Sequence, residues 1–341
     1  MWRGALIGFG NVAVHGHLPG WSRRGDVDIV AVADTRPIRR AEAAASVPGA
    51  RWYDSAEALL AAEPLDFVDI CTPPSSHATL AQHALESGVH VLCEKPLVGS
   101  PDELRRLARA ARGRGRIVHT VHNWNQAPIV RRTRELIGTG VVGEVTAVVW
   151  HTLRTRPATV VGADLNWRVD PAVAGGGVLT DHGWHVFYIV QGWIGHAPVA
   201  VSAALETRRH HAFPVEDTAS VQITFPAAKA DIFLTWASDA RRNWAEVSGT
   251  EGVLQILDDT IVVQSRRTGE EHRWRCPPRL SDGSQHPDWF DAVANEFVAV
   301  MGAGDPGASN FVEASWCVAL GSAARVSDRQ GGRPVRVEVR G

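Results

Sequence analysis

Short apolar segments alternate with amphipathic segments throughout the first 122 residues, and this alternation constrains the fold more than any other feature of the chain. The apolar segments are ALIGFG, DIVAVAD, DFVDICTP, VHVLCEKP and RIVHTVH. The segments between them repeat apolar residues every three or four positions, which is typical of amphipathic helices. Continuous apolar strands that alternate with helices indicate a parallel, doubly wound sheet. We therefore predict an α/β domain over residues 1–122.

The pattern changes after about residue 140, where longer segments alternate apolar and polar residues. These segments are GEVTAVVWHTL, PVAVSAALETR, DTASVQITF, KADIFLTWAS, WAEVSGTEGVLQI and TIVVQSRR. Half-buried antiparallel strands show this alternation. Helical patterns near residues 180–194, 287–302 and 310–328 would cover one face of such a sheet. We predict a second domain over residues 123–341, an α+β domain with an open, mainly antiparallel sheet.

The length and charge of the chain exclude several classes of protein. A chain of 341 residues exceeds the usual size of a single core, which agrees with two domains. Its 35 basic and 37 acidic residues nearly balance, so nothing favours nucleic acid or an anionic membrane as a partner. No apolar stretch reaches the roughly 18 residues of a membrane-spanning helix. The N-terminus leads directly into a strand pattern, without the layout of a signal peptide.

The cysteines and tryptophans suggest a compartment and a kind of ligand. The four cysteines are scattered and form no CxxC pair, which argues against a disulfide framework or a thiolate metal site and fits a reducing cytoplasm. They are Cys71, Cys93, Cys276 and Cys317. Thirteen tryptophans stand against two tyrosines. A few of these indole rings in a pocket would suit a sugar-like ligand, whose C–H faces stack on them.

A glycine-rich loop follows the first strand. Gly8, Gly10 and Ala13 form a G-x-G-x-x-A pattern between that strand and a helix. The first glycine permits a tight turn, the second lets the backbone approach a pyrophosphate, and the small third residue lets helix and strand pack closely. Asp34 ends the second strand, 24 residues after Gly10, where it could accept hydrogen bonds from both adenosine ribose hydroxyls. The loop predicts a dinucleotide site; a structural turn with a capping Asp34 is the alternative.

The same region bears on the choice between the two nicotinamide dinucleotides. The Asp34 carboxylate repels a 2′-phosphate, which favours NAD. Arg36, Arg39 and Arg40 follow closely and could accommodate that phosphate instead, or simply decorate a solvated helix. We predict NAD, with NADP as the alternative.

The segment GGGVLTDHGWHVF, residues 175–187, concentrates polar groups and allows three interpretations. Asp181, His182 and His185 could be metal ligands, an acid/base apparatus, or polar residues that satisfy capping and core bonds. In a helix that begins at Thr180, Asp181 and His185 share one face and His182 lies about 100° away. Because this is not the H-x-x-x-H spacing of zinc helices, we predict no metal. The preceding glycines would allow close backbone approach to a ligand.

Two loops end consecutive predicted strands of the first domain, CTPPSSH at 71–77 and VLCEKPL at 91–97. Ligand sites of open parallel sheets lie at the carboxyl ends of the strands, so both loops should face the nicotinamide part of the site. Lys95 would then be a cation that could orient a substrate hydroxyl and assist its deprotonation. The alternative is an ordinary surface lysine.

Together these residues resemble the glucose–fructose oxidoreductase, inositol dehydrogenase and MocA (Gfo/Idh/MocA) family of dehydrogenases. The resemblance runs over nearly the whole chain and includes the glycine loop, Asp34, TPPSSH, EKP, GTGVVGEV, GGGVLTDHGWH and GGRPVRV. It implies a Rossmann domain followed by an α/β domain whose open mixed sheet often mediates dimers or tetramers. It also implies that Lys95, Asp181 and His185 occupy the catalytic positions.

The candidate site residues fall into three sets. The catalytic set is Lys95, Asp181 and His185. The cofactor-binding set is Gly8, Phe9, Gly10, Asn11, Val12, Asp34, Thr35, Thr72, Pro73, His77, Glu94 and Lys95. The substrate-binding set is Asn123, Trp124, Asn125, Trp167, Arg168, Asp181 and His185. The segment at 123–125 could supply amides and a stacking surface for a polyol, although relatives often carry Arg or Tyr there.

The expected function is an NAD(P)-dependent oxidoreductase that moves a hydride between nicotinamide and a secondary alcohol or ketone of a sugar, sugar derivative or cyclitol. In it His185 is the acid/base, Lys95 polarises the oxygen and Asp181 orients the other groups. One alternative is a redox-neutral epimerase, eliminase or glycosidase-type enzyme that oxidises C3 transiently with bound NAD. Another is a non-catalytic dinucleotide-binding sensor. We expect a cytoplasmic homodimer or homotetramer assembled through the C-terminal sheet.

Overall fold

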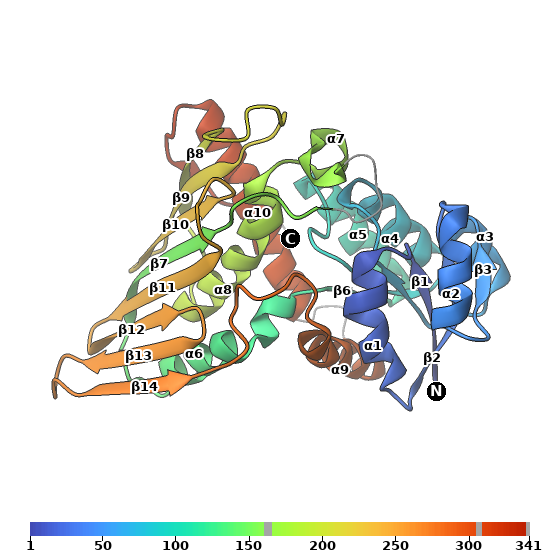
Figure 1. The fold of residues 1–341 in the computed structure, drawn as a ribbon, viewed down its shortest axis with the longest axis horizontal. Helices are drawn as coiled ribbons and strands as arrows, with labels where there is room; N and C mark the ends of the chain where they lie inside the picture. Colours follow the sequence, from blue (N-terminus) through green and yellow to red (C-terminus); the bar gives the residue numbers. More distant parts are fainter. Residues whose placement is uncertain (160–165, 305–308, 339–341) are drawn as a thin grey trace. The chain divides into compact units, whose positions relative to one another are not determined.

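The computed structural model describes residues 1–159, 166–304 and 309–338 (Figure 1). The described chain divides into two compact units. The first contains residues 1–123, 284–304 and 309–315, and the second contains residues 124–159, 166–283 and 316–338. Each unit has its own sheet and is described by itself.

The sheet of the first unit is parallel and six-stranded. Its strands are β1 (Trp2–Ile7), β2 (Val27–Ala33), β3 (Arg51–Tyr53), β4 (Phe67–Ile70), β5 (His90–Cys93) and β6 (Val118–Thr120). They lie in the order β3-β2-β1-β4-β5-β6, and every pair is parallel. Every residue of β4 and β5 is buried, as expected for strands covered on both faces. The predicted doubly wound Rossmann sheet is confirmed.

Helices connect these strands as the amphipathic segments predict. They are α1 (Leu18–Ser22), α2 (Arg40–Ser46), α3 (Ala56–Ala62), α4 (His77–Glu86) and α5 (Pro101–Arg114). A π-helical turn, η1 (Ala13–His17), precedes α1 directly. Helix α5 begins at the Ser100 cap, which accepts a hydrogen bond from the backbone N–H of Glu103. It ends at Gly115 in the left-handed conformation.

Helix α9 (Pro287–Ala303) belongs to the first unit, whereas the sequence placed all of residues 123–341 in the second domain. Its apolar residues Phe290, Val293 and Phe297 recur at helical spacing and are all buried in the core that surrounds β1 and β4. The Phe290 ring lies 5.4 Å from the Trp21 ring of α1. The apolar face was predictable, but periodicity does not say which core a helix joins.

The sheet of the second unit has nine strands. They are β7 (Val145–Leu153), β8 (Ala200–Glu206), β9 (Thr218–Thr224), β10 (Lys229–Thr235), β11 (Arg242–Gly249), β12 (Gly252–Leu257), β13 (Thr260–Ser265), β14 (Glu271–Arg275) and β15 (Val335–Arg336). The order is β14-β13-β12-β11-β7-β10-β9-β8-β15. Among the described strand pairs of this second sheet, only β7–β10 is parallel. The predicted mainly antiparallel sheet is therefore confirmed.

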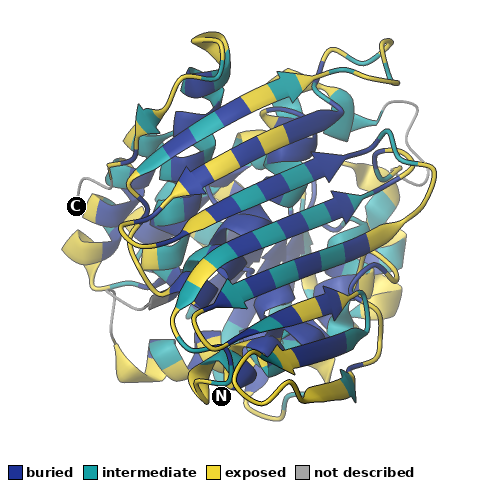
Figure 2. Cartoon of the chain, turned by 90° about the vertical axis from the view of Figure 1, so that its left-hand side faces the viewer, coloured by how far each residue is buried: buried dark blue, intermediate teal, exposed yellow. Residues whose placement is uncertain are grey.

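Helices cover one face of this sheet. They are α6 (Pro128–Gly138), α8 (Trp184–Ile194) and α10 (Ser309–Arg329), and the unit boundary falls inside α10. The short helix α7 (Pro171–Ala174) packs against the turn at Trp167–Val169 instead. Helix α8 packs on β7 and is buried along most of its length. The opposite face carries no helix among the described residues, and its strands alternate buried with half-exposed positions (Figure 2).

None of the described helices is both long enough and apolar enough to cross a membrane.

Candidate active site

The glycine loop joins β1 to η1. Gly8 has a φ of 88°, and a Cβ there would lie 2.9 Å from the backbone nitrogen of Thr72, so the turn requires glycine. A Cβ at Gly10 would meet only the Arg36 guanidinium, at 3.7 Å. The loop backbone at Gly10 is thus open to a ligand, as a pyrophosphate site needs. Asn11 and Val12, which begin the helical turn, are half-buried.

Asp34 is bound to this loop. The backbone N–H of Phe9 donates to Asp34 Oδ2 at 2.7 Å, while the Phe9 ring lies fully in the core. Arg36 donates two side-chain hydrogen bonds to Asp34, at 2.9 and 2.7 Å. Burial opposes ionisation of Asp34, but these hydrogen bonds outweigh it, and its pKa lies below the usual value. The carboxylate is therefore an ionised acceptor beside the exposed Thr35.

The loop after β4 is held from behind by His77. Its side chain is fully buried, with Nδ1 2.7 Å from the carbonyl oxygen of Pro96 and Nε2 2.8 Å from that of Thr72. Carbonyl oxygens only accept hydrogen bonds, so the ring donates to both carbonyls only when both of its nitrogens are protonated. Burial lowers the pKa of His77 and therefore opposes that doubly protonated form. His77 thus shapes the half-buried Thr72–Pro73 turn from within the core.

Lys95 follows β5 directly. The backbone N–H of Lys95 donates to Glu94 Oε2 at 3.0 Å, and the backbone N–H of Glu94 donates to the carbonyl of Ile70 on β4. Of the 35 basic residues of the chain, only Lys95 and Lys229 are lysines. A guanidinium cannot release its proton in a protein, whereas a lysine ammonium can, so lysine at this position is informative.

The segment TDHGWH forms a π-helical turn, η6 (Leu179–Gly183), that continues into α8. The helix predicted near 180–194 is therefore present, with a π turn at its start. Such π turns are frequent at functional sites. The backbone N–H of Val178 donates to the carbonyl of Glu216, against which a Cβ at Gly177 would collide. Gly177 is thus required by a close backbone approach within this unit.

His185 lies in a cage of aromatic groups and is 5% exposed. Its Nδ1 lies 2.8 Å from the hydroxyl of Tyr188, and that hydroxyl accepts a hydrogen bond from the backbone N–H of Trp124 at 3.1 Å. The Trp124 ring stacks on the imidazole, with centroids 4.5 Å apart. The tyrosine hydroxyl and the indole fix the orientation of the imidazole, as a base needs.

Asp181 lies among positive and titratable groups. Its Oδ2 is 3.4 Å from Nδ1 of His182, so the structure brings these two neighbours together. Burial lowers the pKa of Arg154, which is 2% exposed, to about 10, and Asp181 acts against that shift. Asp181 likewise raises the pKa of Arg241, which burial lowers. The charge of the Asp181 carboxylate therefore favours the charged forms of both guanidinium groups.

The remaining substrate candidates differ in exposure. Trp124 is 7% exposed and supports His185. Asn125 is buried, and its Oδ1 accepts a hydrogen bond from Arg134. Trp167 and Arg168 are half-buried in a short 3₁₀ turn, and the Arg168 guanidinium lies 4.4 Å from the centre of the Trp167 ring. Asn123, which begins the turn before α6, is half-buried.

Sequence reasoning assigned no role to a buried polar cluster in the first unit. A ring nitrogen of His17, a carboxylate oxygen of Asp69 and the sulfur of Cys71 lie within 4.8 Å of one another. Among the described residues this is the sole such group of histidine, cysteine and acidic side chains. The signal that could have revealed it is Asp69 inside the apolar strand FVDI, because a buried carboxylate needs a partner. The role of Tyr188 was missed as well, because a single tyrosine in an apolar helical segment gives no signal that its hydroxyl contacts a histidine.

Two family models match the chain. One, described as the oxidoreductase family with an NAD-binding Rossmann fold, matches residues 2–122. The other, the GFO/IDH/MocA C-terminal domain, matches residues 130–255.

Individual proteins are similar over longer stretches. D-glucoside 3-dehydrogenase of Escherichia coli (strain K12) is 34% identical over 185 residues, which are 54% of this chain and 51% of that protein, so the match spans about half of that relative. Trans-1,2-dihydrobenzene-1,2-diol dehydrogenase of Oryctolagus cuniculus is 30% identical over 236 residues, 69% of each chain. The crystal structure of GenD2 from gentamicin A biosynthesis, in complex with NAD, is 26% identical, covers 99% of this chain and 96% of that chain, and has a TM-score of 0.83.

Proposed function

The chain belongs to the Gfo/Idh/MocA family of oxidoreductases with an NAD-binding Rossmann domain, and from that premise we propose that it oxidises a secondary alcohol of a sugar, sugar derivative or cyclitol, or reduces the matching ketone. The observation that carries the proposal is His185, an imidazole oriented by Tyr188 on a helix that begins with the Asp181 turn. A chain that binds NAD and presents an oriented base has the two parts that dehydrogenation requires.

NAD fits the first unit. Gly10 leaves its backbone open to a pyrophosphate, and the ionised Asp34 is an acceptor suited to ribose hydroxyls. When bound, the nicotinamide ring accepts or donates a hydride at C4. We propose that the loops at Thr72–Pro73 and Glu94–Lys95 border that ring. Asp34 favours NAD over NADP because a carboxylate repels a 2′-phosphate, while Arg36, now paired with Asp34, is the group that could accommodate that phosphate.

The proposed acid/base is His185. To take a proton from an alcohol, its Nε2 must be unprotonated, so Nδ1 carries the hydrogen and donates to the Tyr188 oxygen. For ketone reduction the ring supplies the proton from Nε2. We propose that the Lys95 ammonium polarises the same substrate oxygen and that Asp181 accepts a hydrogen bond from a neighbouring hydroxyl.

A cyclic, hydroxyl-rich substrate is consistent with the residues around this base. D-glucoside 3-dehydrogenase, a relative, is named for oxidation at a ring carbon of a sugar. Trp167 and Arg168, half-buried and stacked on each other, are proposed to bind the substrate, together with Asn123 and Asn125. Trp124 contributes from behind His185, by holding the imidazole in place.

The test is a screen for NADH formation from NAD with glucosides and inositols, and for NADH consumption with their keto forms. It uses the purified protein with Lys95→Arg and Lys229→Arg variants. Both variants keep the charge. Lys229 lies on the sheet of the second unit beside Asp231, so it serves as a matched control. We expect Lys95→Arg to lower kcat at least tenfold with NAD affinity retained, and Lys229→Arg to have no effect. Equal turnover in all three proteins would refute the role of Lys95.

The rival functions give different results in the same screen. A redox-neutral enzyme with transient C3 oxidation would convert the sugar without accumulating NADH. A dinucleotide-binding sensor would bind NAD and convert no sugar or ketone.

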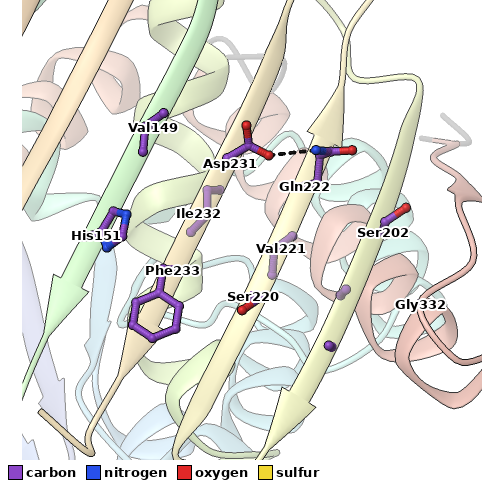
Figure 3. A pocket seen from close by; sticks show the side chains of 12 residues that line it. Val149, His151, Ser202, Ser220, Val221, Gln222, Asp231, Ile232, Phe233 and Gly332 are labelled. Atoms are coloured by element: carbon purple, nitrogen blue, oxygen red, sulfur yellow. Dashed lines mark hydrogen bonds between the residues drawn. The ribbon is translucent and has the colours of Figure 1, made fainter.

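The open sheet face supports a proposal about assembly. A shallow depression of about 390 Å³ crosses β7, β10, β9 and β8 on this face (Figure 3). His151 stacks on Trp244 with centroids 4.1 Å apart and lies 5.4 Å from the Phe233 ring. We propose that a second copy packs on this aromatic row, giving a homodimer or homotetramer. Phe233→Glu should reduce the molar mass measured by light scattering.

A cytoplasmic location completes the proposal, since all four cysteines are buried thiols.

A further inference from the structure

A buried histidine joins two carboxylates beneath the Lys95 loop. His17 is 2% exposed and ends the π-helical turn that follows the glycine loop. Its Nδ1 lies 2.9 Å from Oδ2 of Asp69, on β4. Its Nε2 lies 3.0 Å from Oε1 of Glu94, which follows β5. One imidazole therefore links the helix after the glycine loop to the ends of two neighbouring strands.

The surroundings hold this ring in one orientation. The Phe290 ring of α9 stacks on it, with centroids 4.0 Å apart and planes 13° apart. The indole N–H of Trp21 donates to the same Asp69 oxygen, at 2.7 Å. The Cys71 sulfur lies 3.2 Å from Nδ1. Asp69, Glu94 and Cys71 are the titratable groups in contact with the ring.

Each ring nitrogen of His17 lies within hydrogen-bond distance of a carboxylate oxygen. Ionised carboxylates only accept hydrogen bonds, so an imidazole between two of them is doubly protonated. Burial opposes the charge, but the interactions with Asp69 and Cys71 together outweigh it, and the pKa of His17 lies well above its usual value. Burial opposes ionisation of Glu94, but the hydrogen bond and charge of His17, together with Lys95, outweigh it, and the pKa of Glu94 is lowered. Burial raises the pKa of Cys71 to about 12, so that side chain stays a thiol.

The second oxygen of Glu94 leads to Lys95. Glu94 Oε2 accepts the backbone N–H of Lys95, so the carboxylate that His17 fixes also fixes the peptide bearing the lysine. On the other side, the carbonyl of Pro96 contacts His77. Lys95 therefore stands between two residues that buried histidines hold from the core.

We propose that His17 is a positioning residue for Lys95: by bridging Asp69 and Glu94, it sets the backbone from which the ammonium group reaches the substrate. This inference rests on the proposed role of Lys95. Because the same turn carries His17 and follows the phosphate-binding loop, binding of the dinucleotide and placement of Lys95 share one structural element. The alternative is that the cluster only stabilises the core.

The first experiment needs no activity. Hydrogen exchange of the Lys95 amide is measured in the full-length protein, in His17→Gln and in the control His119→Gln. His119 is also a buried histidine of this unit, 2% exposed, but it lies on β6. We expect exchange of the Lys95 amide to accelerate at least tenfold in His17→Gln and to stay unchanged in His119→Gln. Unchanged exchange in His17→Gln overturns the proposal even if the enzyme is active.

The second experiment separates positioning from stabilisation with a double-mutant cycle. His17→Gln should lower kcat by about 10- to 100-fold, since small misplacements of reacting groups have effects of this size. In the Lys95→Ala background the same change should lower kcat less than about twofold. Equal losses in both backgrounds overturn the proposal. Absence of turnover in the wild type refutes the proposed function, while the amide exchange still tests His17.

A measurement on the wild-type protein covers a failure of the variant to fold. Nitrogen NMR of histidine-labelled protein at neutral pH should show His17 with both ring nitrogens protonated. A neutral ring would leave one carboxylate without a donor and would overturn the proposal.

Discussion

Gly177 marks the tightest backbone approach in the turn that leads to Asp181 and His185. A Cβ there would collide with the carbonyl of Glu216, which also accepts the N–H of Val178 at 3.1 Å. In Gly177→Ala the carbonyl must move away, at an overpacking cost of about 1–3 kcal/mol. Losing the buried hydrogen bond adds about 1 kcal/mol. The free energy of unfolding of this unit should fall by roughly 2–4 kcal/mol.

The assay is thermal unfolding, with Gly192→Ala as the matched control. Gly192 lies exposed in α8, and no atom comes within 4 Å of the position that a Cβ would take there. Alanine at this position should stabilise the helix by up to about 1 kcal/mol. For a unit of this size Gly177→Ala should lower the Tm by at least about 4 °C. An unchanged Tm would show that the backbone at Glu216 moves away from the new Cβ without a loss of stability, and would refute the reasoning.

Three further predictions concern the base, the cofactor and acid stability. Tyr188→Phe should lower kcat about three- to tenfold with little change in KM, because the ring loses the hydroxyl that orients His185; an unchanged kcat would contradict this role. Asp34→Asn should weaken NAD binding about tenfold or more and narrow the preference for NAD over NADP, as titration calorimetry would show. Equal affinities of the wild type and the variant for NAD would contradict this role of Asp34. Burial lowers the pKa of His119 to about 3 in the folded protein. As the pH falls below about 6.5, this histidine therefore becomes protonated in the unfolded chain but not in the folded protein, and the free energy of unfolding decreases. Urea midpoints between pH 7.5 and 4.5 should change less in His119→Gln than in the wild type, and parallel curves would refute the assignment.

Most of the fold was predictable from local sequence patterns. The five apolar segments of the first 122 residues became five of the six strands of the parallel sheet, since a strand covered on both faces must be apolar throughout. The sixth, β3 (Arg51–Tyr53), is short and not buried, so no apolar segment marks it. Helix α9 shows the limit of such patterns. Phe290 and Phe297 gave a clear helical period, yet the pattern contains no information about the partner core, and the helix returned to the first unit.

The candidate site was predictable where a motif forces the backbone. Gly8 is needed for a positive φ, and the GGG segment does contain a glycine with no space for a side chain, Gly177. Polar contacts over long separations were not predictable. His17 and Asp69 are 52 positions apart, and nothing local in an amphipathic helix distinguishes a histidine that meets a buried carboxylate from a solvated one. Trp124 shows the same limit, because composition did not reveal that its ring would support His185.

The measurement that tests the central claim most directly is the fate of hydrogen at the reacting carbon. The purified protein is incubated with NAD and a methyl glucoside or inositol deuterated at its ring carbons, and the dinucleotide is examined by mass spectrometry. The account predicts deuterium on the nicotinamide together with a keto sugar, abolished by His185→Ala. If the protein binds NAD but deuterium leaves none of the substrates tested, the result would contradict the account.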